Sequence, residues 1–255
     1  MLQVRVIPVL LLKGQGLVKT VQFKNEKYIG DPINAIKIFN VKEVDELAFL
    51  DITASKEKRE PNYNLIHQIA GECFMPLSYG GGIKTVEQIR KILSLGVEKV
   101  IINTAAAENP NFIRQGADLF GSSTIVVSID IKKNLFGKNT VYTCDGTINT
   151  KKNPIEYARY IEQQGAGELL INSIDADGMM KGYDIELVKN IVDAVNIPVI
   201  CCGGAGKIDD IQAVVQKTNV SGVAAGSMFV YQGPHKAVLI SYPDYKTLQA
   251  ILKKN

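Results

Sequence analysis

The sequence predicts a single (β/α)₈ barrel made of two similar halves. Three observations lead to this fold class: a length of 255 residues, an alternation of short apolar with longer amphipathic segments, and an internal repeat offset by about half the chain. Barrels of this kind typically need about 250 residues as one domain. We therefore expect one domain over residues 1–255, with half-barrels of roughly 1–122 and 123–255.

The expected strands and helices alternate along the whole chain. Strands are predicted at 4–12, 46–52, 76–79, 99–102, 124–131, 168–173, 198–202 and 222–225. Helices are predicted at 32–41, 62–73, 85–95, 110–120, 154–164, 184–195, 208–216 and 242–253. This alternation is typical of a parallel sheet, and eight units favour closure into a barrel. The alternative is an open doubly wound sheet, which would prefer a glycine fingerprint after its first strand, and the sequence has none there.

The repeat appears as matching motifs at nearly constant offsets. The Pro-Leu-Ser-Tyr-Gly-Gly-Gly stretch from Pro76 resembles Pro-Val-Ile-Cys-Cys-Gly-Gly from Pro198. In the same way, the end of the first strand matches the end of the fifth, so that Leu11 is the counterpart of Asp130. Ordered matches of this kind indicate two four-stranded halves, whereas a solenoid would show more and shorter repeats.

The composition excludes several classes of function. The net charge is +3, with 46% hydrophobic and 22% charged residues, which gives no reason to expect nucleic acid or a membrane surface as a partner. No apolar run has membrane-spanning length, and no signal peptide is recognised, so a cytoplasmic protein is expected. The four cysteines lack metal-ligand spacing, and we expect neither a metal site nor a cofactor.

Two phosphate-binding sites are predicted at the carboxyl ends of the strands, where barrel enzymes place their chemistry. Glycines let a phosphate approach backbone N–H groups, and hydroxyls add further donors. The first site would use the glycines at 80–82 with Asn103 and Thr104, and the second the glycines at 203, 204 and 206 with Gly226 and Ser227. Asp177-Gly178 can contribute one more backbone donor to the second site. Tight turns are the alternative interpretation of each glycine cluster.

Acid–base chemistry is expected between the two phosphate sites. Asp130 ends the fifth strand, but a mechanism acting on both sides of a substrate needs a second proton-transferring group, and Leu11 cannot be one. Further rim candidates are Lys13, Lys19, Asp51, Asp175 and Asp177, for which loop caps or solvated charges are the alternatives. The long segment 13–30 is expected to be a mobile basic lid or an exposed ordered loop, and 132–145 to contain a small hairpin.

Charged residues also stand at the opposite, amino ends of four predicted strands: Arg5, Glu46, Lys99 and Glu168. Two positive and two negative side chains at one end of a barrel suit a mutually paired ring, because unpaired buried charges are costly. On spacing alone, ordinary ion pairs supporting the barrel base are the favoured interpretation.

The whole chain resembles the cyclase (HisF-type) subunit of imidazole glycerol phosphate synthase. The resemblance rests on an ordered set of motifs, among them residues 45–55, Tyr-Gly-Gly-Gly-Ile at 79–83, Ile-Asn-Thr-Ala-Ala at 102–106 and Gly-Gly-Ala-Gly at 203–206. It implies a HisH-like glutaminase subunit docked at the amino-terminal face, and ammonia that passes a charged gate formed by Arg5, Glu46, Lys99 and Glu168. It also implies a phosphate-bearing substrate, held at one end by Gly82, Asn103 and Thr104 and at the other by Gly178, Gly204, Gly226 and Ser227.

The sequence departs from that family at two positions of the implied active site. The family's catalytic pair is one aspartate on strand one and one on strand five; Asp130 matches the second, whereas Leu11 occupies the first. The family's usual basic residue after strand six is here Ala176. A divergent branch, associated with surface-polysaccharide gene clusters, is more similar in its leucine-rich first strand and in segments 16–21 and 233–240.

Three functions follow from the resemblance. The first is a HisF-like synthase subunit that uses glutaminase-derived ammonia for acetamidino-sugar formation, with a possible separate amidotransferase. The second is an imidazole glycerol phosphate synthase cyclase of histidine biosynthesis. The third is a non-catalytic ammonia conduit or scaffold. Leu11 favours the first or third, and the retained Asp130 with two phosphate sites favours a bound ligand.

Overall fold

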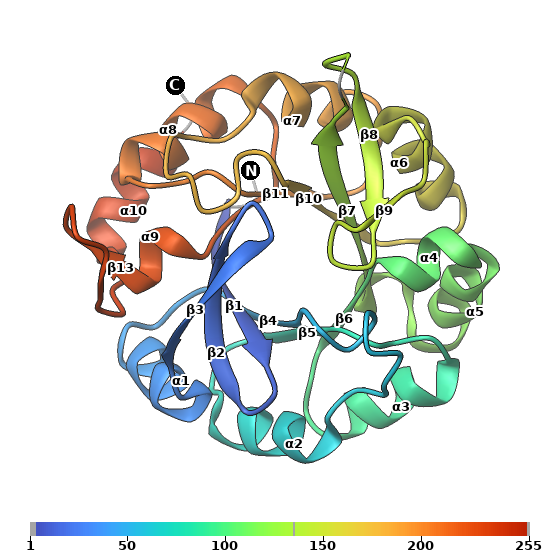
Figure 1. Cartoon of the computed structure of the whole chain (residues 1–255), viewed down its shortest axis with the longest axis horizontal. Helices are drawn as coiled ribbons and strands as arrows, with labels where there is room; N and C mark the ends of the chain where they lie inside the picture. Colours follow the sequence, from blue (N-terminus) through green and yellow to red (C-terminus); the bar gives the residue numbers. More distant parts are fainter. Residues whose placement is uncertain (1–3, 135, 254–255) are drawn as a thin grey trace.

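The computed structural model describes residues 4–134 and 136–253. In these residues eight parallel strands close into a barrel, which Figure 1 shows along its axis. They are β1 (Arg5–Lys13), β4 (Leu47–Asp51), β5 (Leu77–Gly80), β6 (Lys99–Ile102), β7 (Ile125–Lys133), β10 (Glu168–Ser173), β11 (Val199–Cys202) and β12 (Gly222–Ala225). The pairing of β12 with β1 and of β7 with β10 completes the ring, so the predicted (β/α)₈ barrel is confirmed.

Helices surround the barrel in the order expected. They are α1 (Pro32–Val41), α2 (Tyr63–Glu72), α3 (Val86–Ser94), α5 (Asn111–Phe120), α6 (Pro154–Gln163), α7 (Ile185–Val192), α8 (Ile208–Lys217) and α10 (Tyr245–Leu252). Six of these eight helices begin after a side chain that accepts a backbone N–H of the first turn, as where Asp31 accepts the N–H of Asn34. The last helix begins three residues later than predicted, because Asp244 caps it by accepting the N–H of Thr247.

Side chains of the barrel strands alternate between two cores. In β1, Leu10 and Leu12 pack outward against the helices, whereas Ile7 and Val9 belong to a separate apolar cluster inside the barrel. Because successive side chains of a strand point to opposite faces, the inner row of β1 runs from Arg5 at the amino end to Leu11 at the carboxyl end. The same alternation directs the other strands' polar ends into the barrel axis.

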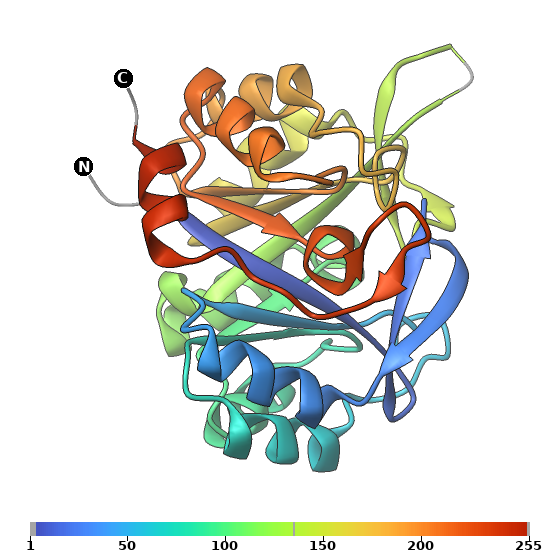
Figure 2. The same cartoon turned by 90° about the vertical axis from the view of Figure 1, so that its left-hand side faces the viewer.

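Antiparallel arms extend the barrel at its carboxyl end, opposite the end at which α10 lies (Figure 2). The arm formed by β2 (Gly16–Val21) and β3 (Lys24–Gly30) continues β1, and its turn residues Gln22 and Phe23 both have positive φ. Segment 13–30 is therefore largely a two-stranded arm and not an irregular loop, and its movement as a lid stays a prediction. The hairpin predicted within 132–145 is confirmed as β7 with β8 (Asn139–Thr143), to which β9 (Ile148–Asn149) adds.

Two short helices follow β6 and β12 at corresponding places in the barrel. α4 (Thr104–Glu108) begins at Thr104, and α9 (Ser227–Val230) begins at Ser227, as expected for the latter from the sequence. A small unpredicted hairpin of β13 (Tyr231–Gln232) and β14 (Ala237–Val238) comes after α9. The boundary between two half-barrels stays a prediction from the sequence.

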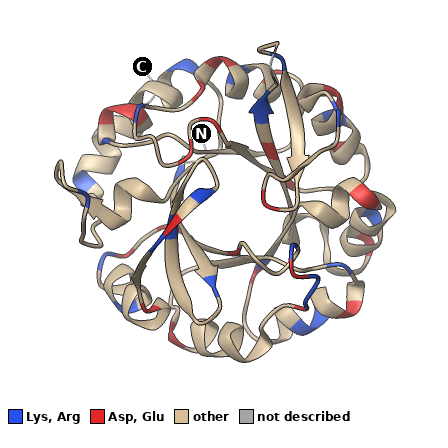
Figure 3. Cartoon of the chain, in the orientation of Figure 1, with Lys and Arg blue, Asp and Glu red and all other residues tan. Residues whose placement is uncertain are grey.

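Charged residues of both signs are spread around the ring of helices in Figure 3. No helix within residues 4–134 and 136–253 combines the length and apolar character that a bilayer crossing requires.

Candidate active site

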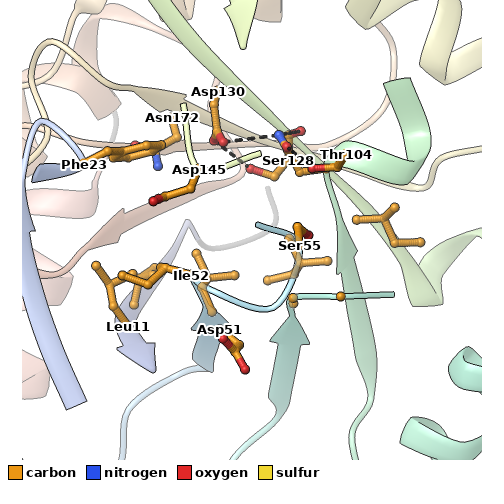
Figure 4. A pocket seen from close by; sticks show the side chains of 18 of the residues that line it. Leu11, Phe23, Asp51, Ile52, Ser55, Thr104, Ser128, Asp130, Asp145 and Asn172 are labelled. Carbon is orange, nitrogen blue, oxygen red and sulfur yellow. Dashed lines mark hydrogen bonds between the residues drawn. The ribbon is translucent and has the colours of Figure 1, made fainter. Parts of the chain in front are cut away.

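A pocket opens at the carboxyl ends of the barrel strands (Figure 4). Its wall combines apolar side chains, backbone glycines and carboxylates from both halves of the sequence. Residues that line it include Leu11, Lys19, Phe23, Asp51, Gly82, Asn103, Thr104, Ser128, Asp130, Asp145, Asn172, Asp177, Cys202 and Gly226. The structure thus brings together many of the site residues predicted from separate strands.

Asp130 stands on the inner face of β7 and is buried at the bottom of the pocket. Its carboxylate accepts hydrogen bonds from Ser128 Oγ and Asn103 Nδ2, each at 3.2 Å. Burial raises the pKa of Asp130 to about 7; the hydrogen bond from Ser128 opposes the shift, and the charges of Asp145 and Asp177 add to it. Near neutral pH, this carboxyl group is therefore able both to accept and to donate a proton.

Leu11 lines the same pocket from β1, four strands away from β7 around the barrel. Its neighbour on β4 in the sheet register is Leu50, another apolar pocket residue. The pocket wall that β1 and β4 form opposite Asp130 is therefore apolar at Leu11 and Leu50.

Asp145 is a pocket residue that the sequence analysis did not single out. It lies in the turn after β8, where Cys144, Asp145 and Gly146 all have positive φ. Burial raises the pKa of Asp145 to about 6; Lys56 and Lys13 lower it, whereas Glu26 and Asp177 add to the increase. The predicted hairpin at 132–145 was the only sequence feature that pointed to Asp145. The turn of this hairpin reaches the pocket through contacts with residues distant in sequence, which the sequence pattern does not predict.

Lys19 and Asp177 form a buried ion pair at the edge of the pocket. Lys19 Nζ donates to Asp177 Oδ1 and to the backbone oxygen of Thr20, each at 2.9 Å. Thr20 Oγ1 donates to the other carboxylate oxygen at 3.2 Å. These contacts attach the β2–β3 arm to the loop that follows β10. The arm belongs to the first half of the sequence and the loop to the second.

The other rim candidates have structural partners. Asp51 lines the pocket, but it accepts the N–H groups of Thr53 and Ala54 and pairs with Arg59 at 2.8 Å, as the loop-cap alternative expects. Two further candidates are not among the lining residues: Asp175 accepts the N–H of Lys133, and Lys13 pairs with Glu26.

The first predicted phosphate site faces the pocket. Gly82, Asn103 and Thr104 all line it. Gly82 has a φ of +73°, and a Cβ there would approach the backbone oxygen of Arg59 to 2.8 Å, so close packing alone already requires glycine. The hydroxyl of Thr104 accepts the N–H of Cys144 at 3.1 Å, which fixes the turn that carries Asp145.

The second predicted phosphate site is only partly open. Gly226 lines the pocket, whereas Gly178, Gly204 and Ser227 are not among its lining residues. A Cβ on Gly178 would approach the backbone oxygen of Thr20 to 2.5 Å, because the β2–β3 arm lies on this loop. The hydroxyl of Ser227 is buried and has no hydrogen-bond partner in the described part of the chain.

The four charged residues at the amino ends form a ring across the barrel floor. Glu46 accepts from Arg5 Nη1 at 2.5 Å and pairs with Lys99 Nζ at 3.3 Å; Glu168 pairs with Arg5 and, at 2.9 Å, with Lys99. Ser78 Oγ adds a hydrogen bond to Glu46 at 2.7 Å. Both glutamates are buried, so each gains its stability from two opposite charges.

A second, narrow cavity lies inside the barrel between this ring and the pocket. It touches Glu46 and Ser78 at the floor, and it shares Val9 and Ile101 with the wall of the pocket. The rest of its lining is apolar: Ile7, Ala48, Val126, Leu170, Ile200 and Ala224. The charged ring, the apolar cavity and the acidic pocket are therefore stacked along one axis.

The described residues hold no group of three or more His, Cys, Asp or Glu side chains arranged to bind a metal ion. His67 and His235 are both exposed.

Comparison with known proteins places this geometry in a family. The family model described as "Histidine biosynthesis protein" matches residues 5–236. A Pseudomonas aeruginosa protein, named provisionally as an imidazole glycerol phosphate synthase HisF subunit, is 58% identical over 97% of this chain and 99% of its own. A Leptospira borgpetersenii protein with a similar provisional name is 52% identical over 98% of this chain and 99% of its own. The imidazole glycerol phosphate synthase subunit HisF of Petrotoga mobilis is 47% identical over 91% of this chain and 92% of its own. The chain therefore belongs to the family of HisF-type imidazole glycerol phosphate synthase subunits.

Proposed function

We propose that this chain is the ammonia-using synthase subunit of a glutamine amidotransferase system, and that it serves acetamidino-sugar formation for surface polysaccharides. The observation that carries the first part is the stack of charged ring, apolar cavity and acidic pocket along the barrel axis. A HisH-like glutaminase docked at the floor would release ammonia at one end of this stack, and the reaction would take place at the other.

The floor and the cavity suit the passage of ammonia in its neutral form. Moving an ammonium ion from water to a space lined by apolar side chains costs a large hydration free energy, whereas moving neutral ammonia costs much less. Arg5 and Lys99 close the floor by pairing with Glu46 and Glu168. Passage requires at least one of these pairs to separate, so the ring acts as a gate whose opening docking of the glutaminase would control.

The pocket suits a ligand with phosphate groups. Gly82, Asn103 and Thr104 offer backbone and side-chain donors on one side. On the other side, the buried hydroxyl of Ser227 has no hydrogen-bond partner among the described residues. A phosphate oxygen could accept a hydrogen bond from it. Gly178 and Gly204 complete this second site in our proposal, and access to it would require the β2–β3 arm to shift.

Asp130 is the group that we assign to proton transfer. Asp130 lines the pocket, and its pKa of about 7 suits a group that exchanges protons near neutral pH.

The acetamidino-sugar role is supported by the differences from ordinary HisF subunits. Leu11 replaces the strand-one aspartate in the pocket wall, and Ala176 removes a basic side chain near the second phosphate site. The two segments that resemble the polysaccharide-linked branch are β2, which lies on the pocket rim, and the exposed hairpin around β13 and β14. A pocket rim that differs from that of ordinary HisF subunits would suit a different substrate.

A comparison of two acceptors tests the proposal. The purified chain receives ammonium chloride with the substrate of imidazole glycerol phosphate synthase, or with an acetamido nucleotide sugar and the separate amidotransferase. We expect amidine formation with the sugar, and cyclase turnover at least about 10²-fold below that of an ordinary HisF subunit, since one acid–base group is missing. Cyclase turnover at the ordinary rate would instead favour histidine biosynthesis. Inertness with both acceptors, while a co-encoded glutaminase still co-purifies, would favour a conduit.

A further inference from the structure

The two opposite inner strands supply only one proton-transferring group to the pocket, because Leu11 faces it from β1 and Asp130 from β7. Addition of ammonia to a carbon bonded to oxygen needs two such groups: one accepts a proton from nitrogen, and one donates a proton to oxygen. We propose that Asp145 is the second group and that Asp130 and Asp145 act as a pair. This inference rests on the proposed function and specifies the residues that carry out its proton transfers.

The fold holds Asp145 in place from two sides. The N–H of Cys144 donates to Thr104 Oγ1, which fixes the start of the turn to the helix that opens after β6. Behind Asp145, Gly146 packs so closely against Phe23, the turn residue of the β2–β3 arm, that a Cβ would lie 3.0 Å from the ring. The positive φ of Asp145, 57°, is uncommon for a residue other than glycine and persists only where surrounding contacts enforce it.

The carboxylate of Asp145 lacks the partners that hold other pocket carboxylates. Asp51 is paired with Arg59 and Asp177 with Lys19. No hydrogen bond or ion pair reaches the Asp145 carboxylate from residues 4–134 or 136–253. Figure 4 places Asp145 between Asp130 and the wall formed by Leu11 and Ile52. It is therefore the carboxylate available on the side where β1 offers none.

The two carboxyl groups have different environments. Burial raises the pKa of Asp130 to about 7, with the negative charges of Asp145 and Asp177 adding to the shift. Burial raises the pKa of Asp145 to about 6, and the charged groups around it are Lys56, Glu26, Asp177 and Lys13. Both pKa values are raised toward neutral pH, and the negative charge of Asp145 favours the protonated form of Asp130, so the pocket can hold one ionised and one protonated carboxyl group.

The step conserves atoms and electrons. The lone pair of ammonia forms the carbon–nitrogen bond, and the π pair of the carbon–oxygen bond moves to oxygen. Oxygen takes the proton of Asp130, and Asp145 takes a proton from the new ammonium group. The adduct then collapses: the lone pair of one nitrogen forms the carbon–nitrogen double bond, the carbon–oxygen bond breaks, and the hydroxyl takes the proton of Asp145 and leaves as water. The amidine stays protonated, and Asp130 regains its proton from solvent, which reaches the pair because Asp145 is only half-buried.

Activity and pH dependence test the pair. We compare Asp145→Asn with Asp118→Asn, which changes an exposed carboxylate on α5 outside the pocket. With ammonium chloride, the acetamido nucleotide sugar and the separate amidotransferase, at constant free ammonia, D145N is expected to lower kcat by about 10²-fold or more with little change in KM. It should also remove the acidic limb of a bell-shaped profile. Leu11→Asp added to D145N should recover at least part of the loss, because it places a carboxylate on the apolar side of the pocket. Wild-type kcat in D145N, or an unchanged profile, would overturn the inference.

A measurement without substrate separates this inference from the proposed function. Carbon-13 NMR of labelled aspartate carboxyls follows the titration of Asp130 in the wild type, D145N and D118N. The Asp130 pKa should fall in D145N, because a neighbouring negative charge is removed, and should stay in place in D118N. If the wild type turns over neither acceptor, the proposed function fails, and this titration decides whether the two carboxyls are paired. An Asp130 pKa that does not respond to D145N contradicts the pairing.

Discussion

Leu11 and Asp130 face the same pocket from strands that lie four positions apart around the barrel. They are counterparts in the internal repeat, so the sequence places an apolar and a titratable side chain at corresponding positions. The pocket is therefore chemically asymmetric within a framework that repeats. Most of the expected behaviour of this protein follows from that asymmetry.

Asp130→Asn should reduce ammonia-dependent turnover by about 10²–10⁴-fold, because it removes a proton-transferring group while keeping the size of the side chain and one accepting oxygen. Circular dichroism should be unchanged. A variant that retains more than about a tenth of wild-type kcat would show that Asp130 does not transfer the proton.

The same variant should change how stability depends on pH. The folded pKa of Asp130, about 7, lies above its ordinary value of 3.8, so the folded state binds this proton more tightly than the unfolded chain. The free energy of unfolding should therefore fall as pH rises from about 4 to about 7, by up to about 1.4 kcal/mol per pH unit for one group. Urea denaturation across this range should show a smaller fall in D130N. Parallel curves would contradict the raised pKa.

Ser227→Ala tests the second phosphate site. The hydroxyl is buried and has no hydrogen-bond partner among residues 4–134 and 136–253, so its removal should leave stability unchanged or slightly higher. It should weaken binding of inorganic phosphate at that site by about tenfold, as expected for loss of one hydrogen bond to a charged group. Calorimetric titration with phosphate measures the change, and Ser123→Ala, at an exposed position, is the control. Equal affinity in both variants would remove Ser227 from the site.

Glu168→Gln tests the paired ring on the barrel floor. It leaves Arg5 and Lys99 with Glu46 as their one remaining carboxylate in the ring. Breaking a fully buried pair costs about 3–5 kcal/mol, but both cations are partly exposed, so we expect about 1–3 kcal/mol in urea denaturation. Lys189→Gln, which breaks an exposed pair with Asp193, should cost less than about 0.5 kcal/mol. Similar midpoints for the two variants would show that the ring does not stabilise the floor.

The barrel was predictable because its signals are local. Runs of apolar residues mark β7 and β10, and the charges of Arg5 and Lys99 stand at strand starts, where strand order alone places them on one floor. The β2–β3 arm was missed although Val18, Thr20 and Val21 favour a strand, because a count of eight strands assigned that segment to a loop. Its turn at Gln22 and Phe23 contains no glycine, so the usual hairpin signal is absent.

The pocket was only partly predictable. Asp130 could be placed from its strand, but the role of a loop carboxylate depends on contacts that sequence does not display. Asp51 and Asp145 both follow strands, yet Arg59 neutralises the first and no described partner neutralises the second. Likewise, Thr20 covers Gly178 because the β2–β3 arm folds over the loop that follows β10, and the sequence does not display this contact.

The central claim is that ammonia travels inside the barrel from a glutaminase to the pocket. The direct measurement supplies glutamine labelled with nitrogen-15 in its amide to the reconstituted glutaminase, this chain and the separate amidotransferase, with the acetamido nucleotide sugar and an excess of unlabelled ammonium. If ammonia is channelled, the amidine nitrogen of the product should carry the label at nearly the enrichment of the glutamine. Dilution of the label to the ratio in bulk solution would contradict passage through the barrel.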